Sequence, residues 1–304
     1  MGNPKVGIVI LNYITHKLTI ECLNNLNAME YDNFFAVVVD NVSPNNSCEE
    51  IENHISQTKF KYDIYLLESD KNGGYSYGNN IGIKKAEKLQ ATYIVIMNND
   101  IVVRDKTFLN RVVDFLDGSQ AIGMIGPGII QKKNMIELPL LPSRIGPFAH
   151  TMNNMLYPFT ILRNKILRKR LQGCRKPIKV YGVSGCCFIM RASVFKEIGY
   201  FDDNLFLYGE EAVLSEKLYQ SGFDIYFVPS IRVFHNHSAT TGSVYETREI
   251  GRMQLESKKY YLSEYRKDLG RQVRFIMMQS DVFRDKVYTP LIAVMKRVAK
   301  RLAM

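Results

Sequence analysis

Tryptophan is absent from this sequence, and cysteine is scarce. The five cysteines are an odd number and include no Cys-x-x-Cys pair. This pattern gives no sign of a disulfide framework or of a thiolate zinc site. We therefore expect reduced thiols, as in a cytoplasmic protein.

Long apolar runs are also missing. No stretch approaches the ~18–20 apolar residues that cross a bilayer, and the first dozen residues lead into a strand-like run rather than a signal peptide. With 304 residues, 46% hydrophobic and 23% charged, the chain has room for one large domain plus an appendage. Fibrous, disordered and multi-span membrane classes are excluded, and we expect a cytoplasmic protein.

Acidic residues are absent between Leu138 and Lys196, although the chain as a whole carries 30 of them against 40 basic residues. Eleven bases fall in that window: Arg144, Arg163, Lys165, Arg168, Lys169, Arg170, Arg175, Lys176, Lys179, Arg191 and Lys196. Such a surplus suits nucleic acid, anionic lipid or a negatively charged substrate. We expect residues 138–180 to form a mobile helical or loop insertion.

Apolar, β-branched runs alternate with helical spacing over the first hundred residues, which predicts a parallel, doubly wound α/β sheet. The expected strands are Val6–Leu11, Phe34–Val39, Asp63–Leu67 and Tyr93–Met97, with helices at Thr15–Met29, Glu49–Ile55 and from Asn80 to about Leu89. Asn72–Asn80 is rich in residues that favour turns. The alternation of strands and helices becomes less regular after Gly118. Further strands are expected at Val180–Met190, Asp224–Val228 and Val233–His237, with helices at Ala192–Ile198, Glu210–Ser221 and beyond Gly242.

Polar side chains follow two of these strands, where ligands of such sheets gather. Asn98-Asn99-Asp100 comes after the strand that ends at Met97. Its hard oxygen ligands suit Mg²⁺ or Mn²⁺ bound to a diphosphate, and a plain turn is the alternative. Asp40-Asn41 follows the second strand, where a carboxylate can accept hydrogen bonds from a base or a ribose; here too a turn is the alternative.

Three further segments carry candidate chemistry. Asn72-Gly73-Gly74 would let the backbone approach a nucleotide closely, although neither Gly-x-x-x-x-Gly-Lys-Ser/Thr nor Gly-x-Gly-x-x-Gly is present. Glu210-Glu211 opens a predicted helix, where carboxylates either compensate the helix dipole or supply a general base. His235 and His237 end an apolar strand. A histidine there is either a metal ligand or a hydrogen-bonded core residue.

Seven ordered blocks together closely resemble glycosyltransferase family 2, in its bacterial rhamnosyltransferase-like branch, over roughly residues 5–242. The blocks are VILNY (Val9–Tyr13), VVDNVSPNNS (Val38–Ser47), NGGYSYGNNIGI (Asn72–Ile83), MNND (Met97–Asp100), VSGCCFIMR (Val183–Arg191), IGYFDDNLFLYGEE (Ile198–Glu211) and VFHNHSATTG (Val233–Gly242).

The resemblance implies a GT-A fold, with a catalytic domain over residues 1–242 and a C-terminal helical extension over 243–304. It implies an inverting transfer of a sugar from a nucleotide-diphosphate sugar, with Glu211 as the base and Ser184, Gly185 and Glu210 on the acceptor side. The divalent metal would be held by Asp100 and His235. The implied nucleotide-sugar site comprises Asn12, Asp40, Asn41, Asn72, Gly73, Asn80, Asn99 and Asp100.

Three positions depart from the family pattern. Asn98 replaces the first acid of the Asp-x-Asp motif, as also happens in this branch, and removes one negative charge. Glu211 stands where Asp is common. The Arg-Asn pair that often follows the tyrosine-rich stretch is missing, because Tyr260-Tyr261-Leu262 runs into Ser263-Glu264.

We weigh two rivals against a metal-dependent transferase that uses a UDP- or dTDP-sugar and a lipid-linked cell-surface polysaccharide acceptor. A nucleotidyltransferase of similar fold would need a glycine-rich basic loop after the first strand, and Asn12–Lys17 offers none. A basic nucleic-acid or membrane-binding module would leave the polar motifs at the strand ends unexplained. We expect no nucleic-acid partner.

The last fifteen residues predict an amphipathic helix that begins at Pro290 with Thr289 as its cap. Leu291, Val294, Met295, Val298 and Leu302 share one stripe, and residues 290–304 contain bases but no acid. Such a helix either lies on an anionic membrane surface or packs on the catalytic domain. We expect peripheral attachment to the inner face of the plasma membrane.

Overall fold

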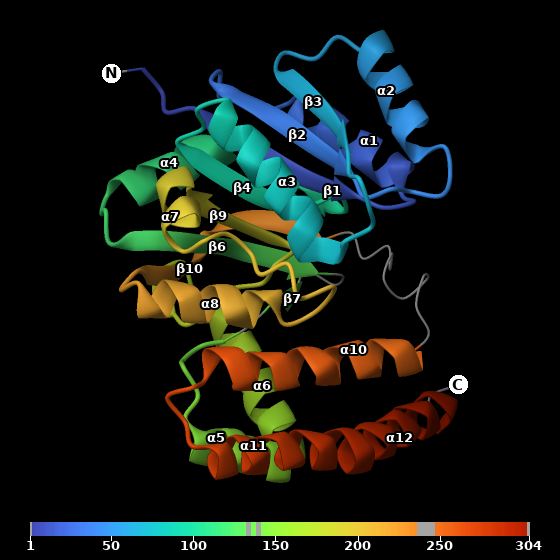
Figure 1. Cartoon of the computed structure of the whole chain (residues 1–304), viewed down its shortest axis with the longest axis vertical. Helices are drawn as coiled ribbons and strands as arrows, with labels where there is room; N and C mark the ends of the chain where they lie inside the picture. Colours follow the sequence, from blue (N-terminus) through green and yellow to red (C-terminus); the bar gives the residue numbers. More distant parts are fainter. Residues whose placement is uncertain (1, 132–134, 138–140, 236–246, 303–304) are drawn as a thin grey trace.

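A mixed sheet forms the upper layer of the molecule in a computed structural model that describes residues 2–131, 135–137, 141–235 and 247–302 (Figure 1). Its strand order is β3-β2-β1-β4-β9-β6-β10-β5. The strands are β1 (Val6–Asn12), β2 (Phe34–Asp40), β3 (Asp63–Glu68), β4 (Tyr93–Asn98), β5 (Ile101–Val102), β6 (Ile122–Gln131), β7 (Met135–Ile136), β8 (Ile178–Val180), β9 (Cys187–Arg191) and β10 (Asp224–His235).

The first four strands are parallel, which confirms the doubly wound pattern predicted from the sequence. Strand β9 runs antiparallel between β4 and β6, and β10 is parallel to β6. The short β5 pairs antiparallel with β10 at the edge. The sheet is therefore mostly parallel in its first half and mixed in its second.

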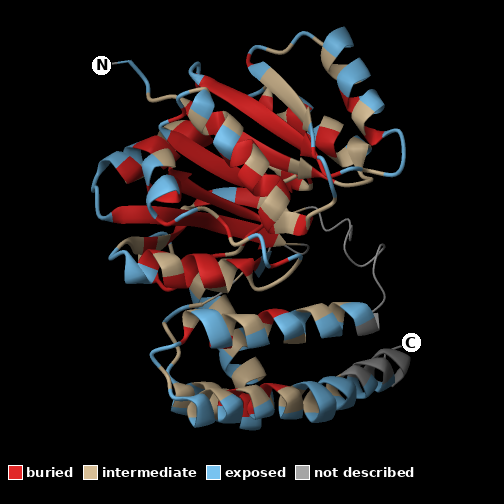
Figure 2. Cartoon of the chain, in the orientation of Figure 1, coloured by how far each residue is buried: buried red, intermediate tan, exposed pale blue. Residues whose placement is uncertain are grey.

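Helices cover both faces of this sheet, and each face has its own apolar cluster. Ile8 and Ile10 pack with α1 (His16–Leu26), α2 (Ser47–Gln57) and α4 (Phe108–Asp117). Val9, which points to the opposite face, packs with α3 (Gly74–Lys88), α7 (Ala192–Glu197) and α8 (Glu210–Gln220). Figure 2 shows the central strands as almost entirely buried.

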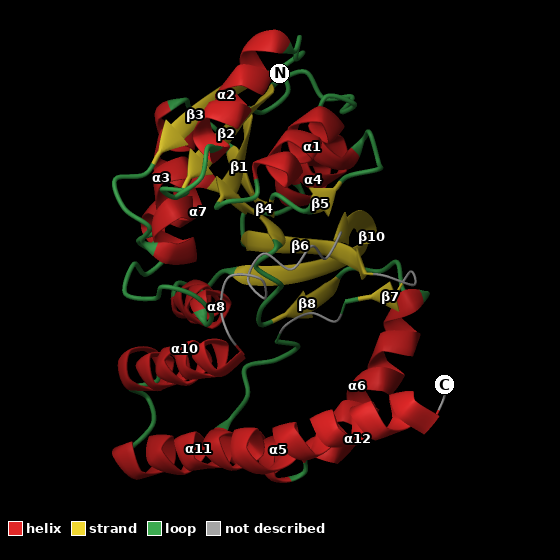
Figure 3. Ribbon diagram, turned by 90° about the vertical axis from the view of Figure 1, so that its right-hand side faces the viewer, coloured by secondary structure: helices red, strands yellow, loops and turns green. Residues whose placement is uncertain are grey.

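A second, helical layer lies beside the sheet layer and draws on two parts of the chain (Figure 3). The basic window supplies α5 (Pro147–Met155) and α6 (Tyr157–Gln172), so its centre is helical. The C-terminal part supplies α10 (Thr247–Tyr260), α11 (Arg271–Phe283) and α12 (Thr289–Leu302), joined by the π-helical turns η2 (Tyr261–Tyr265) and η3 (Arg284–Tyr288). The predicted domain boundary at residue 242 and His237 lie outside the described residues.

Charged side chains join the two layers. Arg144, which precedes α5, donates from Nη2 to Glu216 of α8 at 2.7 Å and to Asp268 at 3.2 Å. The Tyr181 hydroxyl also donates to Glu216, whose side chain is fully buried. One carboxylate of α8 thus receives donors from a residue before α5 and from a residue after α6.

Three local expectations are wrong. Residues 74–80 are not a turn but the start of α3. Gly78 and Gly82 let this helix lie close to β1, because a Cβ at these positions would lie 2.3 Å from the side chains of Leu11 and Val9, respectively. The later strands are also divided differently from the prediction. The strand expected at Val180–Met190 is split into β8, which pairs with β10, and β9, which lies between β4 and β6. The two strands expected at 224–237 form one strand, β10, with a register shift after Val228.

The third wrong expectation concerns the last helix. Thr289 is not a cap, since its φ of −63° and ψ of −47° are helical and α12 continues directly from η3. The packing alternative for this helix also fails in the described part, where Leu291, Val294, Met295 and Val298 are each half exposed or more.

Candidate active site

The ends of β4 and β10 bring Asp100 and His235 together. Asp100 lies two residues beyond β4, and His235 is the last residue of β10, paired with Ile101 of β5. Nε2 of His235 donates to Oδ2 of Asp100 at 3.0 Å. The other carboxylate oxygen, Oδ1, is buried and has no hydrogen-bond partner among the described residues. A buried carboxylate oxygen left without a donor is a natural position for a bound cation.

Glu137, which no sequence motif marks, lies on the other side of His235. Ligand atoms of Glu137, Cys186 and His235 all lie within 4.8 Å of one another. Hard divalent cations such as Mg²⁺ or Mn²⁺ prefer carboxylate and imidazole ligands to a thiol. The candidate ligands are therefore His235 and the two carboxylates beside it, Asp100 and Glu137.

The pKa of His235 reflects these neighbours. Burial lowers it, but the hydrogen bond to Asp100 and the negative charges of Asp100 and Glu137 more than offset that effect, so the net shift is upward. The upward shift reflects the two carboxylates beside the imidazole, whose negative charge a bound cation would also balance.

Glu211 lies at the start of α8, against the turn that precedes β9. A Cβ on Gly185 would come within 2.7 Å of Oε1 of Glu211, so only glycine leaves room for the carboxylate there. Burial raises the pKa of Glu211, backbone hydrogen bonds from its own amide and from Gly185 lower it, and the charge of Glu137 raises it; the net shift is upward. The pKa of Glu211 is thus higher than that of an exposed glutamate.

The turn that carries Ser184 and Gly185 is held from two sides. The Tyr75 hydroxyl of α3 donates to the Gly185 carbonyl at 2.6 Å, and the Asn98 amide at the end of β4 donates to the Cys186 carbonyl at 2.8 Å. The Ser184 hydroxyl is 3.4 Å from Oε1 of Glu137. These contacts bring the metal-ligand cluster and the Glu211 turn to the same end of the sheet.

Glu210, the neighbour of Glu211, is 6% exposed. Its Oε2 has no hydrogen-bond partner within the described ranges. Burial and the charge of Glu211 raise its pKa well above the usual range. The structure thus places this predicted acceptor-side residue inside the protein.

The predicted nucleotide residues gather at the ends of β1 and β2. Asp40 is buried, and its carboxylate accepts from Asn12 at 2.6 Å and from the Ser43 hydroxyl and amide at 2.7 and 2.8 Å. Asn41 donates to Oδ1 of Asn72 at 2.9 Å, beside Gly73 at the start of α3. Their roles toward a nucleotide stay predictions.

Asn80 and Asn99 support loops. Asn80 donates to the Phe201 carbonyl at 3.1 Å and to Asp203 at 2.5 Å, and it accepts from the Phe201 amide. Asn99 donates to the hydroxyls of Thr15 and Thr19, both at 2.9 Å. Both side chains therefore hold the segments around the site in position.

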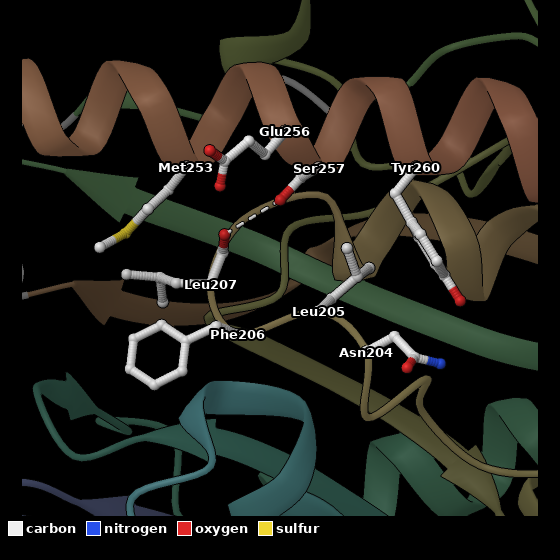
Figure 4. A pocket seen from close by; sticks show the side chains of 8 residues that line it. All are labelled: Asn204, Leu205, Phe206, Leu207, Met253, Glu256, Ser257 and Tyr260. Atoms are coloured by element: carbon white, nitrogen blue, oxygen red, sulfur yellow. Dashed lines mark hydrogen bonds between the residues drawn. The ribbon is translucent and has the colours of Figure 1, made fainter.

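A cavity of about 270 Å³ lies between α10 and the loop that leads to Glu210 (Figure 4). Its lining residues are Asn204, Leu205, Phe206, Leu207, Met253, Glu256, Ser257 and Tyr260. The Phe206 carbonyl accepts from the Tyr75 amide at 2.9 Å, which connects this loop to α3. The loop then reaches Glu210 through Gly209, whose φ of +85° favours glycine.

Comparison with known proteins gives a consistent result. The family model described as "Glycosyl transferase family 2" matches residues 6–199, and one described as "Glycosyltransferase (GlcNAc)" matches residues 122–298. The low-salt glycan biosynthesis hexosyltransferase Agl10 of Haloferax volcanii is 25% identical over 76% of this chain and 67% of its own length. The N-acetylglucosaminyl-diphospho-decaprenol L-rhamnosyltransferase of Mycobacterium tuberculosis is 23% identical over 59% of this chain, a match that spans 61% of its own length.

Two solved structures show the same fold. The mannosyltransferase PcManGT of Pyrobaculum calidifontis, in complex with GDP-Man and Mn²⁺, aligns with a TM-score of 0.58 at 13% identity over 93% of this chain and 70% of its own. S. aureus TarS 1-349 in complex with UDP-GlcNAc aligns with a TM-score of 0.53 at 15% identity over 91% of this chain and 79% of its own. The fold predicted from the sequence is thereby confirmed.

Proposed function

The chain belongs to glycosyl transferase family 2, and on this premise we propose that it transfers a sugar, with inversion, from a UDP- or dTDP-sugar to a lipid-linked saccharide acceptor. The donor class is supported by the nucleotide-sugar complexes among its structural neighbours. The acceptor class is supported by the decaprenol-linked substrate in the name of the mycobacterial relative.

The observation that carries this proposal is the place of Glu211. Its carboxylate lies against Gly185, and the adjoining Cys186 carbonyl is bonded to the end of β4, next to Asp100. Inversion requires an acceptor hydroxyl to attack the anomeric carbon opposite the departing nucleoside diphosphate. Glu211, with its raised pKa, would accept the proton of that hydroxyl.

Asp100, His235 and Glu137 would hold Mg²⁺ or Mn²⁺. The buried, unpaired Oδ1 of Asp100 and the ligand atoms gathered around His235 support this assignment. The bound cation would neutralise charge that develops on the leaving diphosphate.

The acceptor would approach from the side of Ser184 and of the cavity between α10 and residues 204–207. That cavity combines apolar walls with the polar ends of Asn204, Glu256 and Ser257, which suits a saccharide. The donor nucleotide would lie by Asn41, Asn72 and Gly73. A lipid-linked acceptor would hold the enzyme at the inner face of the plasma membrane, as a peripheral protein.

Glu211→Gln tests the proposal. The amide keeps the shape of the side chain but accepts no proton, so turnover should fall about 10²–10⁴-fold while donor affinity in calorimetry stays unchanged. Glu211→Asp is the matched control, because it keeps the carboxylate and should retain far more activity. Turnover of the Gln variant within about tenfold of the parent would reject Glu211 as the base.

Asp100→Ala tests the metal site without an activity assay. Binding of Mn²⁺ and of a nucleoside diphosphate is measured by calorimetry, with and without chelator. We expect the parent to bind the nucleotide more tightly with Mn²⁺ and the variant to lose that difference. Equal affinity of the parent in both conditions would reject the metal assignment.

A further inference from the structure

The helical layer has a polar interior. Where α5 and α11 contact one another, His150 lies 3.0 Å from Asp281, and Asn154 donates to Ser280 at 2.9 Å and to Asp281 at 3.1 Å. Asp281 is 1% exposed. Arg284 and Lys258 add ion pairs to the same carboxylate. We name these residues the polar seam.

Apolar side chains of the same helices face the solvent instead. Phe148 of α5 is 80% exposed and Phe275 of α11 is 62% exposed. Helix α6 has no buried residue at all, and its Phe159 is 70% exposed. Leu162 and Ile166 of α6, Ile276 of α11, and Leu291 and Met295 of α12 are also exposed. We name these residues and the three phenylalanines the outer apolar residues.

This layer buries few apolar side chains, among them Met277 and Leu262, whereas the sheet layer and water-soluble helical bundles bury most of theirs. Figure 2 shows exposed positions along the outer side of α11 and α12. Large exposed apolar side chains that recur on every one of these neighbouring helices indicate a site of association.

Positive charge accompanies these residues. Helix α6 contains Arg163, Lys165, Arg168, Lys169 and Arg170 and no acid, and residues 271–304 contain eight bases against two acids, one of which is the buried Asp281. No described helix is both long and apolar enough to cross a bilayer. Apolar side chains flanked by bases are the pattern of helices that lie in the interface of an anionic bilayer.

We propose that the helical layer docks on an anionic lipid bilayer through the outer apolar residues, with the bases of α6 contacting lipid headgroups. This inference deepens the proposed function by naming the surface that brings the enzyme to a lipid-linked acceptor, and it rests on that function only for the acceptor. The polar seam then has a clear role, because it holds α5 and α11 together without drawing their apolar side chains inward.

The test is flotation of the full chain with vesicles of phosphatidylcholine alone or mixed with phosphatidylglycerol. We expect binding to the mixed vesicles at low salt and release as salt rises. Phe159→Ser/Phe275→Ser should weaken binding by about tenfold or more, since it removes two large apolar side chains from the interface.

Two double variants with the same change in charge distinguish direct contact with lipid from an effect of net charge. Lys165→Glu/Lys169→Glu should weaken binding by about tenfold or more. Lys59→Glu/Lys61→Glu makes the same change beyond α2, at the opposite end of the molecule (Figure 1), and should leave binding unchanged. Equal losses in both pairs would overturn the proposal, because net charge alone would explain them.

Two other results would also overturn it. Either the full chain fails to float with the mixed vesicles at low salt, or light scattering finds a dimer that Phe159→Ser/Phe275→Ser dissolves, in which case a second copy covers the outer apolar residues. Donor binding, measured by calorimetry without vesicles, keeps failure of this inference distinct from failure of the proposed function.

Discussion

The two layers of this molecule place apolar and polar residues in opposite ways. In the sheet layer, Phe188 and its neighbours on β4 and β9 fill the interior, and the polar site residues stand at the strand ends. In the helical layer, Asp281 and Asn154 occupy the interior while Phe148 and Phe275 face outward. The sheet layer is therefore stabilised by apolar burial, and the helical layer depends on hydrogen bonds and ion pairs inside it.

The largest expected contrast compares two phenylalanines. Phe188→Ala should destabilise the protein by about 3–5 kcal/mol, because Phe188 is 1% exposed and its removal leaves a cavity. Phe275→Ala should change the free energy of unfolding by less than about 0.5 kcal/mol. Chemical denaturation of both variants measures the difference. A large loss in the Phe275 variant would mean that the helical layer has an apolar core after all.

Asp281→Asn should destabilise the helical layer by about 2 kcal/mol at neutral pH, since it leaves His150, Lys258 and Arg284 without their shared carboxylate. Burial raises the pKa of Asp281, but the hydrogen bond from His150 and the nearby positive charges lower it further, so the net shift is downward. The stabilisation is thus fully present above the unfolded pKa of ~3.9 and is lost as pH falls through the lower folded pKa.

Hydrogen exchange of α5 and α11, compared between pH 7 and acid pH, measures this effect by region. The stabilities of the parent and the Asn variant should begin to converge as pH falls below about 4 and should meet only below the folded pKa of Asp281. Exchange that is equal in both proteins at neutral pH would show that the polar seam contributes nothing.

The smallest expected effect concerns two buried carboxylates on one helix. Glu210 has a raised pKa, so its contribution favours folding below the unfolded pKa and is lost as pH rises toward the folded pKa. Glu210→Gln should therefore stabilise the protein at neutral pH, by about 1 kcal/mol, and the gain should grow as pH rises above the unfolded pKa of ~4.3.

Glu216→Gln is the matched control. The bonds from Arg144 and Tyr181 outweigh the effect of burial and lower the pKa of Glu216, so this variant should lose stability at the same pH. Denaturation curves at several pH values distinguish the two. Equal signs for both variants would contradict the assignment of Glu210 as an unpaired buried acid.

The part of the fold that the sequence predicts well is the part with continuous apolar strands. Strands β1, β2 and β4 are buried on both faces, so every residue signals burial. Strand β6 was not predicted, because its glycines are typical of loops. Gly123 and Gly126 pack against Phe223 and Val183, where a Cβ would come within 2.7 and 2.5 Å, so these glycines mark close packing rather than a loop.

The candidate site also contains residues that the sequence marks and one that it does not. Asp100, Glu211 and His235 were singled out because each stands at or just after a strand end or at a helix start, and the family resemblance implied their roles, which stay predictions. The structure brings the three residues to one end of the sheet. Glu137 has no motif around it. Its one signal was its position as the last acid before the acid-free window, and only the pairing of β6 with β7 brings it to Cys186 and His235.

Helix α8 carries Glu211 in its first turn and Glu216, the partner of Arg144, five residues later. At 1.5 Å per residue these positions are about 7.5 Å apart along one rigid axis. Through Arg144, the helical layer is therefore tied to the helix that also carries Glu211, the proposed base. If that layer rests on a bilayer as proposed, its distance from Glu211 limits how far the acceptor's reacting hydroxyl can lie from its lipid anchor.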